Sequence, residues 1–304
     1  MPFRDLYRRQ VALLVRILPL VAEEESFALK GGTAINLFVR DMPRLSVDID
    51  LTYVPIAERA DSLAAIDAAL RRIAERARSA LPDAQVLETP LQREAAITKL
   101  LVRLQGVQIK IEVTPVLRGC VYEPELRSVS PSVEDVFGFA EIRVVSFADL
   151  YGGKIVAALD RQHPRDLFDV RDLLANEGID DALRRAFIIY LLSHDRPMHE
   201  VIAPTRKDIS IEFERGFQGM VDLDVTLDDL VAAREELITT AVRGMPKEHR
   251  RFLISFEEGK PDWSLLGTNA SDLPAVRWRQ QNLDKLGDQA RAALVSRLEE
   301  ALEV

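Results

Sequence analysis

The chain has 304 residues, of which 47% are hydrophobic and 29% are charged, a composition typical of a globular protein long enough for two domains. Its formal net charge of −9 argues against a protein that coats nucleic acid, although an enzyme that visits one nucleic-acid end needs only a local basic patch. With a single cysteine, Cys120, the chain can form neither an internal disulfide nor a cysteine-rich zinc site.

The sequence also bears on location. The N-terminal apolar stretch is interrupted by Arg16 and is not followed by a small-residue cleavage site, so it does not predict a secretory signal. The sequence has no run of about 18 uncharged apolar residues, and we therefore expect no transmembrane helix and no membrane partner. We expect a cytoplasmic protein, and the single cysteine fits that reducing compartment.

Apolar periodicity and turn residues predict alternating helices and strands in the first half of the chain. In chain order we expect a helix over 4–22, a strand over 27–29, a helix over 33–39, a strand over 46–53, a helix over 57–80, an edge strand within 83–91, a hairpin of strands over 97–104 and 107–113, a strand over 142–145, and helices over 147–160 and 164–175. From residue 178 the chain is predicted to be mainly helical. This order predicts an α/β or α+β fold with a small mixed sheet flanked by helices, followed by a helical half.

Asp48 and Asp50 carry the strongest chemical signal in the sequence. They alternate with apolar residues on a predicted strand, so both carboxylates point to one face of the sheet. Paired carboxylates suit Mg²⁺, which prefers oxygen ligands and is often shared with substrate phosphates. Just upstream, the turn at Gly31 and Gly32 offers backbone N–H groups to an anion. A metal site beside a phosphate site indicates chemistry on a nucleoside triphosphate.

Glu112 is a candidate third carboxylate. It lies on the predicted strand over 107–113, where apolar residues face one side while Lys110 and Glu112 share the other. If this strand lies beside that of Asp48 and Asp50, three carboxylates around two Mg²⁺ ions would hold a triphosphate for attack by a 3′-hydroxyl. A solvent-facing glutamate on a half-buried strand explains Glu112, taken alone, equally well.

A second group of charged residues lies on two consecutive predicted helices. Lys154 and Arg161 are two turns apart and so near one helical face, and Arg161 and Arg165 can hold phosphates bidentately. Asp166 and Asp169 face the same way on the next helix. The alternative interpretation is a surface ion-pair cluster. We prefer that alternative for Asp169, and a functional role for Lys154 and Asp166.

In combination these residues resemble the AbiEii family of nucleotidyltransferase toxins, a group that includes the mycobacterial MenT toxins. The resemblance covers residues 25–175 and rests on Gly31-Gly32-Thr33-Ala34, on Arg44-x-Ser46-x-Asp48-Ile49-Asp50-Leu51, and on Lys154 with Arg161 and Arg165-Asp166-x-x-Asp169. It implies a DNA-polymerase-β-like nucleotidyltransferase domain over 1–176 and a mainly helical C-terminal domain over 177–304. It also implies a toxin of a toxin–antitoxin pair that moves NMP from an NTP to the 3′ end of tRNA and so blocks aminoacylation and translation, with a cognate antitoxin as partner.

The resemblance further implies a role for each matching residue. Those implied for binding Mg²⁺ or Mn²⁺ are Asp48, Asp50 and Glu112, and those implied for binding the nucleotide are Gly31, Gly32, Thr33, Ser46, Lys154, Arg161 and Arg165. The implied catalytic residues are Asp48, Asp50, Lys154 and Asp166, with Asp166 orienting Lys154 or a metal-bound water. Ser46 is also a candidate for regulatory phosphorylation, the alternative being a serine that hydrogen-bonds its own backbone.

The same residues leave two other functions open. The acceptor of the nucleotide could be a protein side chain or a small molecule, or the fold could bind nucleotide without catalysis. The joint presence of the carboxylates, the Gly-Gly turn and Lys154 argues against the non-catalytic module. Three segments after residue 178 could contact RNA: Arg206-Lys207, 247–252 and Arg277-Trp278-Arg279. Taken singly, each segment is better explained as a solvated helix face. The histidines lack metal-ligand spacing, and we expect at most an accessory role for His163.

Overall fold

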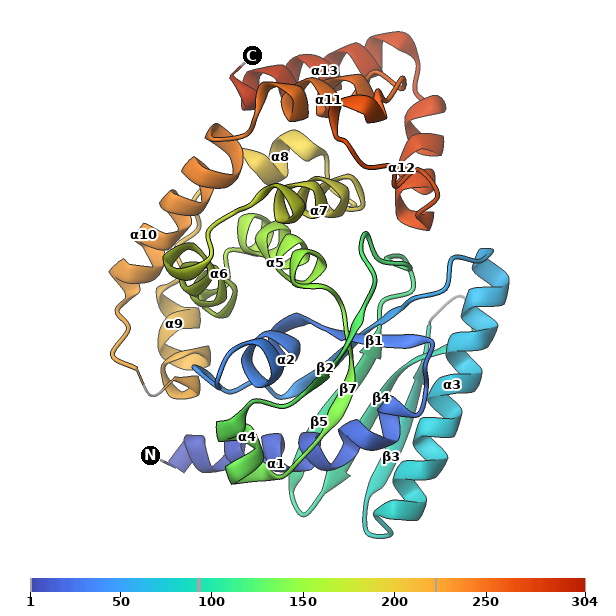
Figure 1. The fold of residues 1–304 in the computed structure, drawn as a ribbon, viewed down its shortest axis with the longest axis vertical. Coiled ribbons are helices and arrows are strands. Elements are labelled where there is room, and N and C mark those ends of the chain that lie inside the picture. The colour runs from blue at the N-terminus through green and yellow to red at the C-terminus, as the bar shows by residue number, and fades with distance from the viewer. Residues whose placement is uncertain (1, 92–93, 222, 304) are drawn as a thin grey trace. The chain divides into compact units, whose positions relative to one another are not determined.

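The structure is a computed structural model that describes residues 2–91, 94–221 and 223–303 (Figure 1). The chain divides into two compact units. Unit 1 comprises residues 1–146 and 216–224, and unit 2 comprises residues 147–215 and 225–304. The predicted boundary at 176/177 does not coincide with this division, because the helices that follow residue 146 pack with later helices of the chain.

Unit 1 is built on a single mixed sheet, which has seven strands in the described part of the chain, in the order β3-β4-β5-β2-β1-β7-β6 (Figure 1). The strands are β1 Phe27–Lys30, β2 Asp48–Tyr53, β3 Gln85–Pro90, β4 Ile97–Leu104, β5 Val107–Val113, β6 Glu125–Ser128 and β7 Glu141–Val144. The pairs β2–β5 and β1–β7 are parallel, and the other neighbours are antiparallel. The predicted mixed sheet is confirmed, whereas β6 has no counterpart among the predicted strands.

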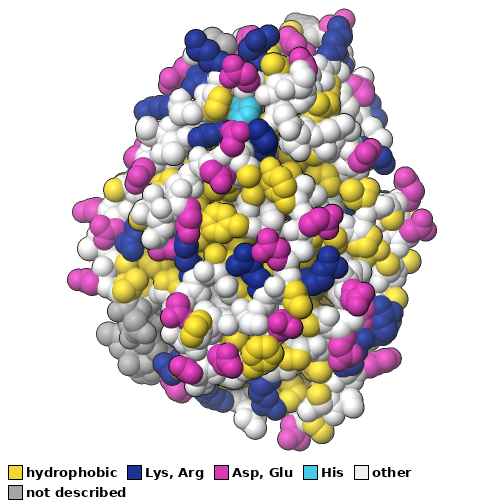
Figure 2. Space-filling view, in the orientation of Figure 1, with side chains coloured by type: hydrophobic (Ala, Val, Ile, Leu, Met, Phe, Trp, Pro, Cys, Tyr) yellow, Lys and Arg dark blue, Asp and Glu magenta, His cyan; other side chains and the backbone are white. Residues whose placement is uncertain are grey.

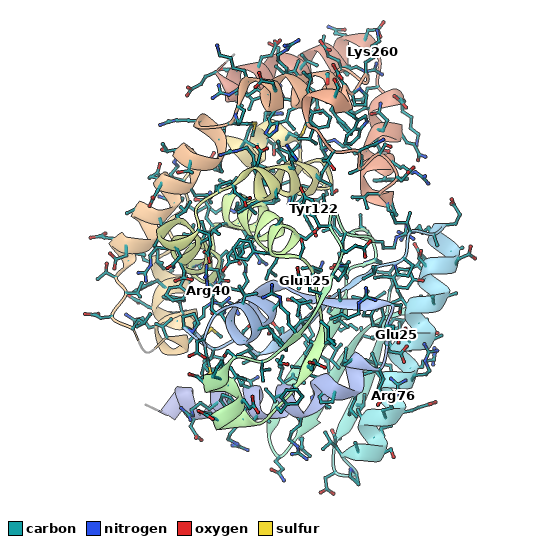
Figure 3. The ribbon with its side chains drawn as sticks, in the orientation of Figure 1. Glu25, Arg40, Arg76, Tyr122, Glu125 and Lys260 are labelled. Carbon is teal, nitrogen blue, oxygen red and sulfur yellow. The ribbon has the colours of Figure 1, made fainter. Side chains whose placement is uncertain are left out.

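Unit 1 also contains helices, of which α1 and α3 pack on the sheet and against each other. They are α1 Pro2–Ala22, α2 Gly31–Ala34 with its π-helical continuation Ile35–Val39, α3 Arg59–Ala80 and α4 Pro131–Phe137, and the 3-10 turn Gln218–Met220 joins the same unit. Helix α1 contacts β5 and β7, α3 contacts β3 and β4, and the two helices contact each other (Figure 1). Arg76 of α3, labelled in Figure 3, ties α3 to the residues that directly follow α1, by ion pairs to Glu23 at 2.8 Å and Glu24 at 2.7 Å.

Strand alternation decides which side chains this helix layer covers. On β5, the odd-numbered residues from Val107 to Val113 are buried, while Lys110 and Glu112 between them are half-buried. On β2, Ile49 and Leu51 are fully buried, and the aspartates that flank Ile49 are half-buried. The apolar face therefore forms the core with α1 and α3, and the charged side chains on the opposite face of the same strands stay partly exposed.

All regular secondary structure in the described residues of unit 2 is helical. Its helices are α5 Phe147–Arg161, α6 Pro164–Asn176, α7 Asp181–Leu192, α8 Met198–Ile202, α9 Ser210–Gly216, α10 Leu227–Leu237 with its π-helical continuation Ile238–Arg243, α11 Lys247–Glu257, α12 Pro274–Asp284 and α13 Asp288–Leu302, with a 3-10 turn at Trp263–Leu265. The core of the unit is α5, which is buried along most of its length and contacts α6, α7, α8 and α10. The predicted mainly helical second half is confirmed.

The surface carries charges of both signs. On the face that Figure 2 shows, basic and acidic side chains are interspersed. In the described part of the chain, no helix is both long enough and apolar enough to span a bilayer.

Candidate functional site

The sheet face turned away from α1 and α3 carries a row of charged side chains. These residues come from four adjacent strands, β1, β2, β5 and β4, and lie opposite one another in the strand register. We call them the charged row; from β1 to β4 it runs Lys30, Asp50, Glu112 and Lys99, and it includes the neighbouring pair of Asp48 on β2 and Lys110 on β5. The condition stated for Glu112, that its strand lies beside the strand of Asp48 and Asp50, is met by this register.

Within the row, Glu112 is held by lysines. Its carboxylate forms ion pairs with Lys110 at 2.7 Å and with Lys99 at 3.0 Å. Burial acts to raise the pKa of Glu112, but the hydrogen bonds and charges of these two lysines outweigh it and lower that pKa. Burial acts to lower the pKa of Lys110, but Glu112 and the charges of Asp48 and Asp50 raise it instead. Glu112 and Lys110 are therefore both ionised at neutral pH.

This pairing bears on the role predicted for Glu112. Across residues 2–91, 94–221 and 223–303, no group of three or more His, Cys, Asp or Glu side chains is arranged to hold a metal ion. The carboxylate of Glu112 is instead shared by two ammonium groups. Its assignment as third metal ligand thus stays a prediction, and Asp48 and Asp50 are the oxygen donors that β2 places on one face.

Lys30 is a member of the row that the sequence analysis missed. It is the last residue of β1, directly before Gly31, and its ammonium donates to Thr114 Oγ1 at 2.9 Å. Burial lowers the pKa of Lys30, although the charges of Asp50 and Glu112 oppose that shift. The available signal was a lysine that ends a buried strand immediately before the Gly-Gly turn.

Both glycines of that turn are required by what packs against them. Gly31 has a φ of +74°, and a β-carbon there would lie 2.9 Å from Asp50 Oδ2. A β-carbon on Gly32 would lie 2.7 Å from the guanidinium of Arg44 and 3.0 Å from Ser46 Oγ. Since Arg44 is buried, its guanidinium has little room to move away. The turn therefore brings bare backbone directly against the Asp50 carboxylate.

The hydroxyl groups of Thr33 and Ser46 are engaged inside this loop. Thr33 Oγ1 donates to the backbone carbonyl of Asp48 at 2.5 Å and lies 3.0 Å from Ser46 Oγ. Both residues are buried. These contacts fix the start of β2, a structural role that the sequence analysis had not assigned to the two hydroxyl groups. Because Ser46 is buried, an enzyme that phosphorylates it would reach its hydroxyl only after the loop had opened.

Unit 2 holds the second predicted cluster in its interior. Lys154 Nζ lies 2.8 Å from Asp166 Oδ1 and 3.0 Å from Asp169 Oδ2, and Arg161 Nε lies 2.7 Å from Asp166 Oδ2. Lys154 is 7% exposed and Asp169 is 1% exposed. The interpretation of Asp169 as a surface ion-pair residue was therefore wrong, because α6 turns it toward Lys154 inside the unit. Burial acts to raise the pKa of Asp166, but Lys154 and Arg161 hold it far below its usual range.

The neighbours of this cluster have more ordinary roles. Arg161 is exposed, and its guanidinium is bonded through two nitrogens to Asp166. His163 is the N-cap of α6, because its Nδ1 accepts from the backbone N–H of Arg165 at 3.1 Å. Burial lowers the pKa of His163. His163 thus serves to start a helix, and Arg165 lies half-buried in its first turn.

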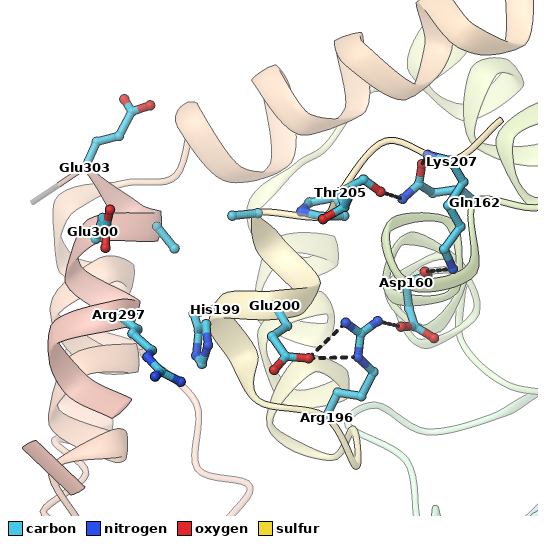
Figure 4. A pocket seen from close by; sticks show the side chains of 13 residues that line it. Asp160, Gln162, Arg196, His199, Glu200, Thr205, Lys207, Arg297, Glu300 and Glu303 are labelled. Atoms are coloured by element: carbon cyan, nitrogen blue, oxygen red, sulfur yellow. Dashed lines mark hydrogen bonds and ion pairs between the residues drawn. The ribbon is translucent and has the colours of Figure 1, made fainter. Parts of the chain in front are cut away.

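Unit 2 also contains a cavity of about 560 Å³ whose lining includes residues from α5, α8 and α13 (Figure 4). In its wall Arg196 is ion-paired with Asp160 and, at 2.9 Å, with Glu200. His199 of α8 and Arg297 of α13 line the same space (Figure 4). None of the residues predicted to bind metal or nucleotide lines this cavity, whereas Lys207 of the candidate RNA-contacting segment Arg206-Lys207 does.

Comparison with known protein families identifies the family to which the chain belongs. The family described as "Nucleotidyl transferase AbiEii toxin, Type IV TA system" matches residues 12–282. The chain belongs to the AbiEii family. It is therefore a nucleotidyltransferase toxin of a type IV toxin–antitoxin system, with a nucleotide substrate and an antitoxin partner.

One solved structure supports the fold of this AbiEii toxin. The nucleotidyltransferase toxin MenT4 from Mycobacterium tuberculosis H37Rv is 15% identical, with 98% of each chain covered and a TM-score of 0.57. At that identity the likeness shows a shared fold. Comparison with curated proteins gave no match. All residues of the charged row and of the Lys154 cluster lie within the family match, whereas α13 lies beyond its end at residue 282.

Proposed function

We propose that this AbiEii toxin transfers NMP from an NTP to the 3′ end of an RNA, the acceptor end of tRNA in particular, and that it needs Mg²⁺ to do so. The observation that carries the proposal is the presence of Asp48 and Asp50 on one face of β2, with Asp50 directly against the bare backbone of Gly31. Carboxylates beside a glycine turn offer a triphosphate both a shared cation and backbone donors.

Asp48 and Asp50 fit a divalent cation. Both supply hard oxygen donors from a rigid strand, and the missing side chain of Gly31 leaves the space next to Asp50 Oδ2 that a β-carbon would fill. When bound, Mg²⁺ would offset the charge on the phosphates and favour ionisation of the attacking hydroxyl. Mn²⁺ accepts the same donors.

In the proposed reaction the 3′-oxygen of the acceptor bonds to the α-phosphorus of the NTP. The bond from that phosphorus to the oxygen bridging to the β-phosphorus breaks, pyrophosphate leaves with the bonding electrons, and the hydroxyl proton passes to solvent. The protein contributes by holding the reacting groups in line and by neutralising charge. The backbone N–H groups of Gly31 and Gly32 would receive phosphate oxygens.

The cluster around Lys154 is proposed to contribute as well. Lys154 would supply positive charge to the triphosphate, and the carboxylates of Asp166 and Asp169 would fix the direction of its ammonium. Arg161 and Arg165 are the further candidates for phosphate contact, and Arg161 is the more exposed of the two.

The test is transfer of label. The purified toxin is incubated with Mg²⁺, total tRNA and each α-labelled NTP in turn, and the products are resolved on a denaturing gel. We expect label on tRNA, and about a 10³-fold loss with Asp48→Ala, the scale of removing a main electrostatic group from an active site. The matched control is Asp83→Ala, since Asp83 is exposed in the turn after α3 and should leave transfer unchanged.

Two outcomes would contradict the proposal. Transfer that survives in a folded Asp48→Ala protein would remove Asp48 from the reaction. Label that appears on a protein or a small molecule, and on no RNA with any NTP, would replace RNA with that acceptor class.

A further inference from the structure

We propose that Lys99 and Lys110 form an acceptor subsite that binds the phosphodiester backbone of the RNA, and that Glu112 positions both lysines for it. The inference rests on the proposed function, since it names where the RNA of that reaction would bind. Neither the family match nor the sequence analysis assigns either lysine a role, and the relevant observation is their place in the sheet.

The order of the strands separates the two ends of the charged row. The Gly31-Gly32 turn follows β1, the aspartates lie on β2, and Lys110 and Lys99 lie on β5 and β4. Neighbouring strands are about 4.8 Å apart, so the strand of Lys99 runs roughly 10 Å from that of Asp50, on the side away from β1. The carboxylates thus lie between the glycine turn and the two lysines.

The geometry of in-line displacement indicates on which side of the aspartates the leaving group and the acceptor would each lie. The attacking and leaving oxygens lie on opposite sides of the reacting phosphorus. If the leaving pyrophosphate lies at the turn of Gly31 and Gly32, the attacking 3′-oxygen approaches from the side of β5 and β4. The phosphodiester that joins the terminal nucleotide to the rest of the RNA then lies over the lysines.

The two lysines are available for such a contact. Their side chains are 30% exposed at Lys110 and 34% exposed at Lys99. An ammonium has three N–H donors, and the described ion pair of each lysine with Glu112 uses one of them. Together with Glu112 they carry one net positive charge, in a chain whose formal net charge is −9. A local cationic group of this kind is what a phosphate can recognise on an acidic protein.

Glu112 is the positioning residue of the subsite. It lies between Lys99 on β4 and Lys110 on β5, and its two carboxylate oxygens bind one lysine each. Long, flexible lysine side chains lose rotamer freedom when they bind a ligand. Holding both ammonium groups against one carboxylate removes part of that loss before the RNA arrives.

The subsite is tested by steady-state kinetics in which tRNA and NTP are varied separately. For the double variant Lys99→Gln/Lys110→Gln we expect the KM for tRNA to rise about tenfold or more, while the KM for NTP stays within about twofold. The salt dependence of kcat/KM for tRNA should also flatten by about 1.4 units of log–log slope, the share of two phosphate contacts on a single strand. Lys99→Arg/Lys110→Arg should restore most of the affinity, because arginine keeps the charge.

The controls come from the same two strands. Arg103 lies on the same face of β4 as Lys99, at the far end of the strand, where its side chain donates to Gln108 at 2.6 Å. Arg103→Gln therefore removes a positive charge from that face without touching the subsite. It should alter neither the KM for tRNA nor the salt slope. Glu112→Gln should raise the KM for tRNA but leave the salt slope as in the wild type, because both lysines remain. A change in slope with Glu112→Gln would contradict its positioning role.

The outcomes separate the two proposals. A wild-type toxin that labels tRNA, together with a double variant whose tRNA KM and salt slope are unaltered, would overturn the subsite alone. A double variant that loses affinity for NTP and keeps its affinity for tRNA would reassign the lysines to the triphosphate. A wild-type toxin that labels no RNA would overturn the proposed function, and the subsite with it.

Discussion

The toxin contains two clusters of lysine and acidic residues that differ in exposure. In unit 2, Lys154 is enclosed with Asp166 and Asp169, both of which are almost completely buried. In unit 1, Lys99 and Lys110 share Glu112 on an open sheet face, with about a third of each side chain exposed. The distances within the two clusters are similar, so distance alone does not distinguish their roles.

Exposure distinguishes the two clusters because it sets the free-energy cost of replacing one ion-pair partner with another. Removing one member of a buried ion cluster leaves an uncompensated charge in the interior, which costs several kcal/mol. An exposed pair contributes about 1 kcal/mol or less, since water solvates each group when the partner leaves. The cluster of unit 2 therefore holds Lys154 in one fixed position, whereas the charged row of unit 1 can release its lysines to a ligand.

The largest expected effect that tests this comparison is on stability. Lys154→Met should lower the free energy of unfolding by about 3–5 kcal/mol, because it leaves Asp166 and Asp169 buried without their shared cation. Lys110→Met, the matched change in unit 1, should cost about 1 kcal/mol or less. Urea unfolding of both variants measures the contrast, and equal losses would show that exposure does not separate the two clusters.

A smaller effect concerns pH. Lys154 and Arg161 lower the pKa of Asp166 in the folded state. Ionised Asp166 therefore stabilises the protein fully at pH values above the pKa of an unfolded aspartate, about 3.9. This stabilisation is lost as the pH falls from there toward the folded-state pKa. Asp166→Asn should cost about 2 kcal/mol at pH 7, the scale of a hydrogen bond to a charged group. The deficit relative to wild type should shrink below about pH 4. Urea unfolding at pH 7 and pH 3 checks this, and a deficit that grows on acidification would contradict it.

The smallest expected change in stability comes from glycine substitutions that distinguish backbone strain from displacement of the Asp50 carboxylate. Gly31 and Gly106 both have positive φ, at +74° and +79°, but only Gly31 has a neighbour that an added β-carbon would meet. Gly31→Ala and Gly106→Ala should each cost about 1–2 kcal/mol from the left-handed backbone. Gly31→Ala should in addition displace the Asp50 carboxylate and lower transfer, whereas Gly106→Ala should keep it. Labelling assays beside thermal melts distinguish the two, and equal transfer in both variants would show that Asp50 tolerates the displacement.

Much of unit 1 could be predicted because its signals are local. Alternation identified the strands of Asp48 and Glu112, and Gln105-Gly106 identified the hairpin that brings β4 beside β5. The short strand β6 and helix α4 were missed, since β6 has only four residues, of which three are exposed, and its sequence carries no alternation of apolar and polar side chains.

What the sequence could not supply is which helix face another element covers. Helical spacing correctly placed Asp166 and Asp169 on one side of α6, but spacing does not tell a solvated face from a buried one. The same limit applies to Lys30 and Lys99, because their place in one row depends on the parallel pairing of β2 with β5, which lie far apart in the sequence. The roles of the site residues in transfer remain predictions for the experiments above.

The segment 216–224 has a consequence for the order in which this toxin is made. It belongs to unit 1, where the backbone of Met220 accepts from Leu45 N–H at 2.8 Å and Val221 forms a bridge with Arg44, the residue that packs against Gly32. A ribosome releases the sheet of unit 1 well before it adds this segment, because residues 147–215 of unit 2 are synthesised between them. The loop that carries Arg44 and Ser46 therefore lacks one of its supports until most of the chain has emerged, and a truncated translation product would carry the aspartates on an incomplete site.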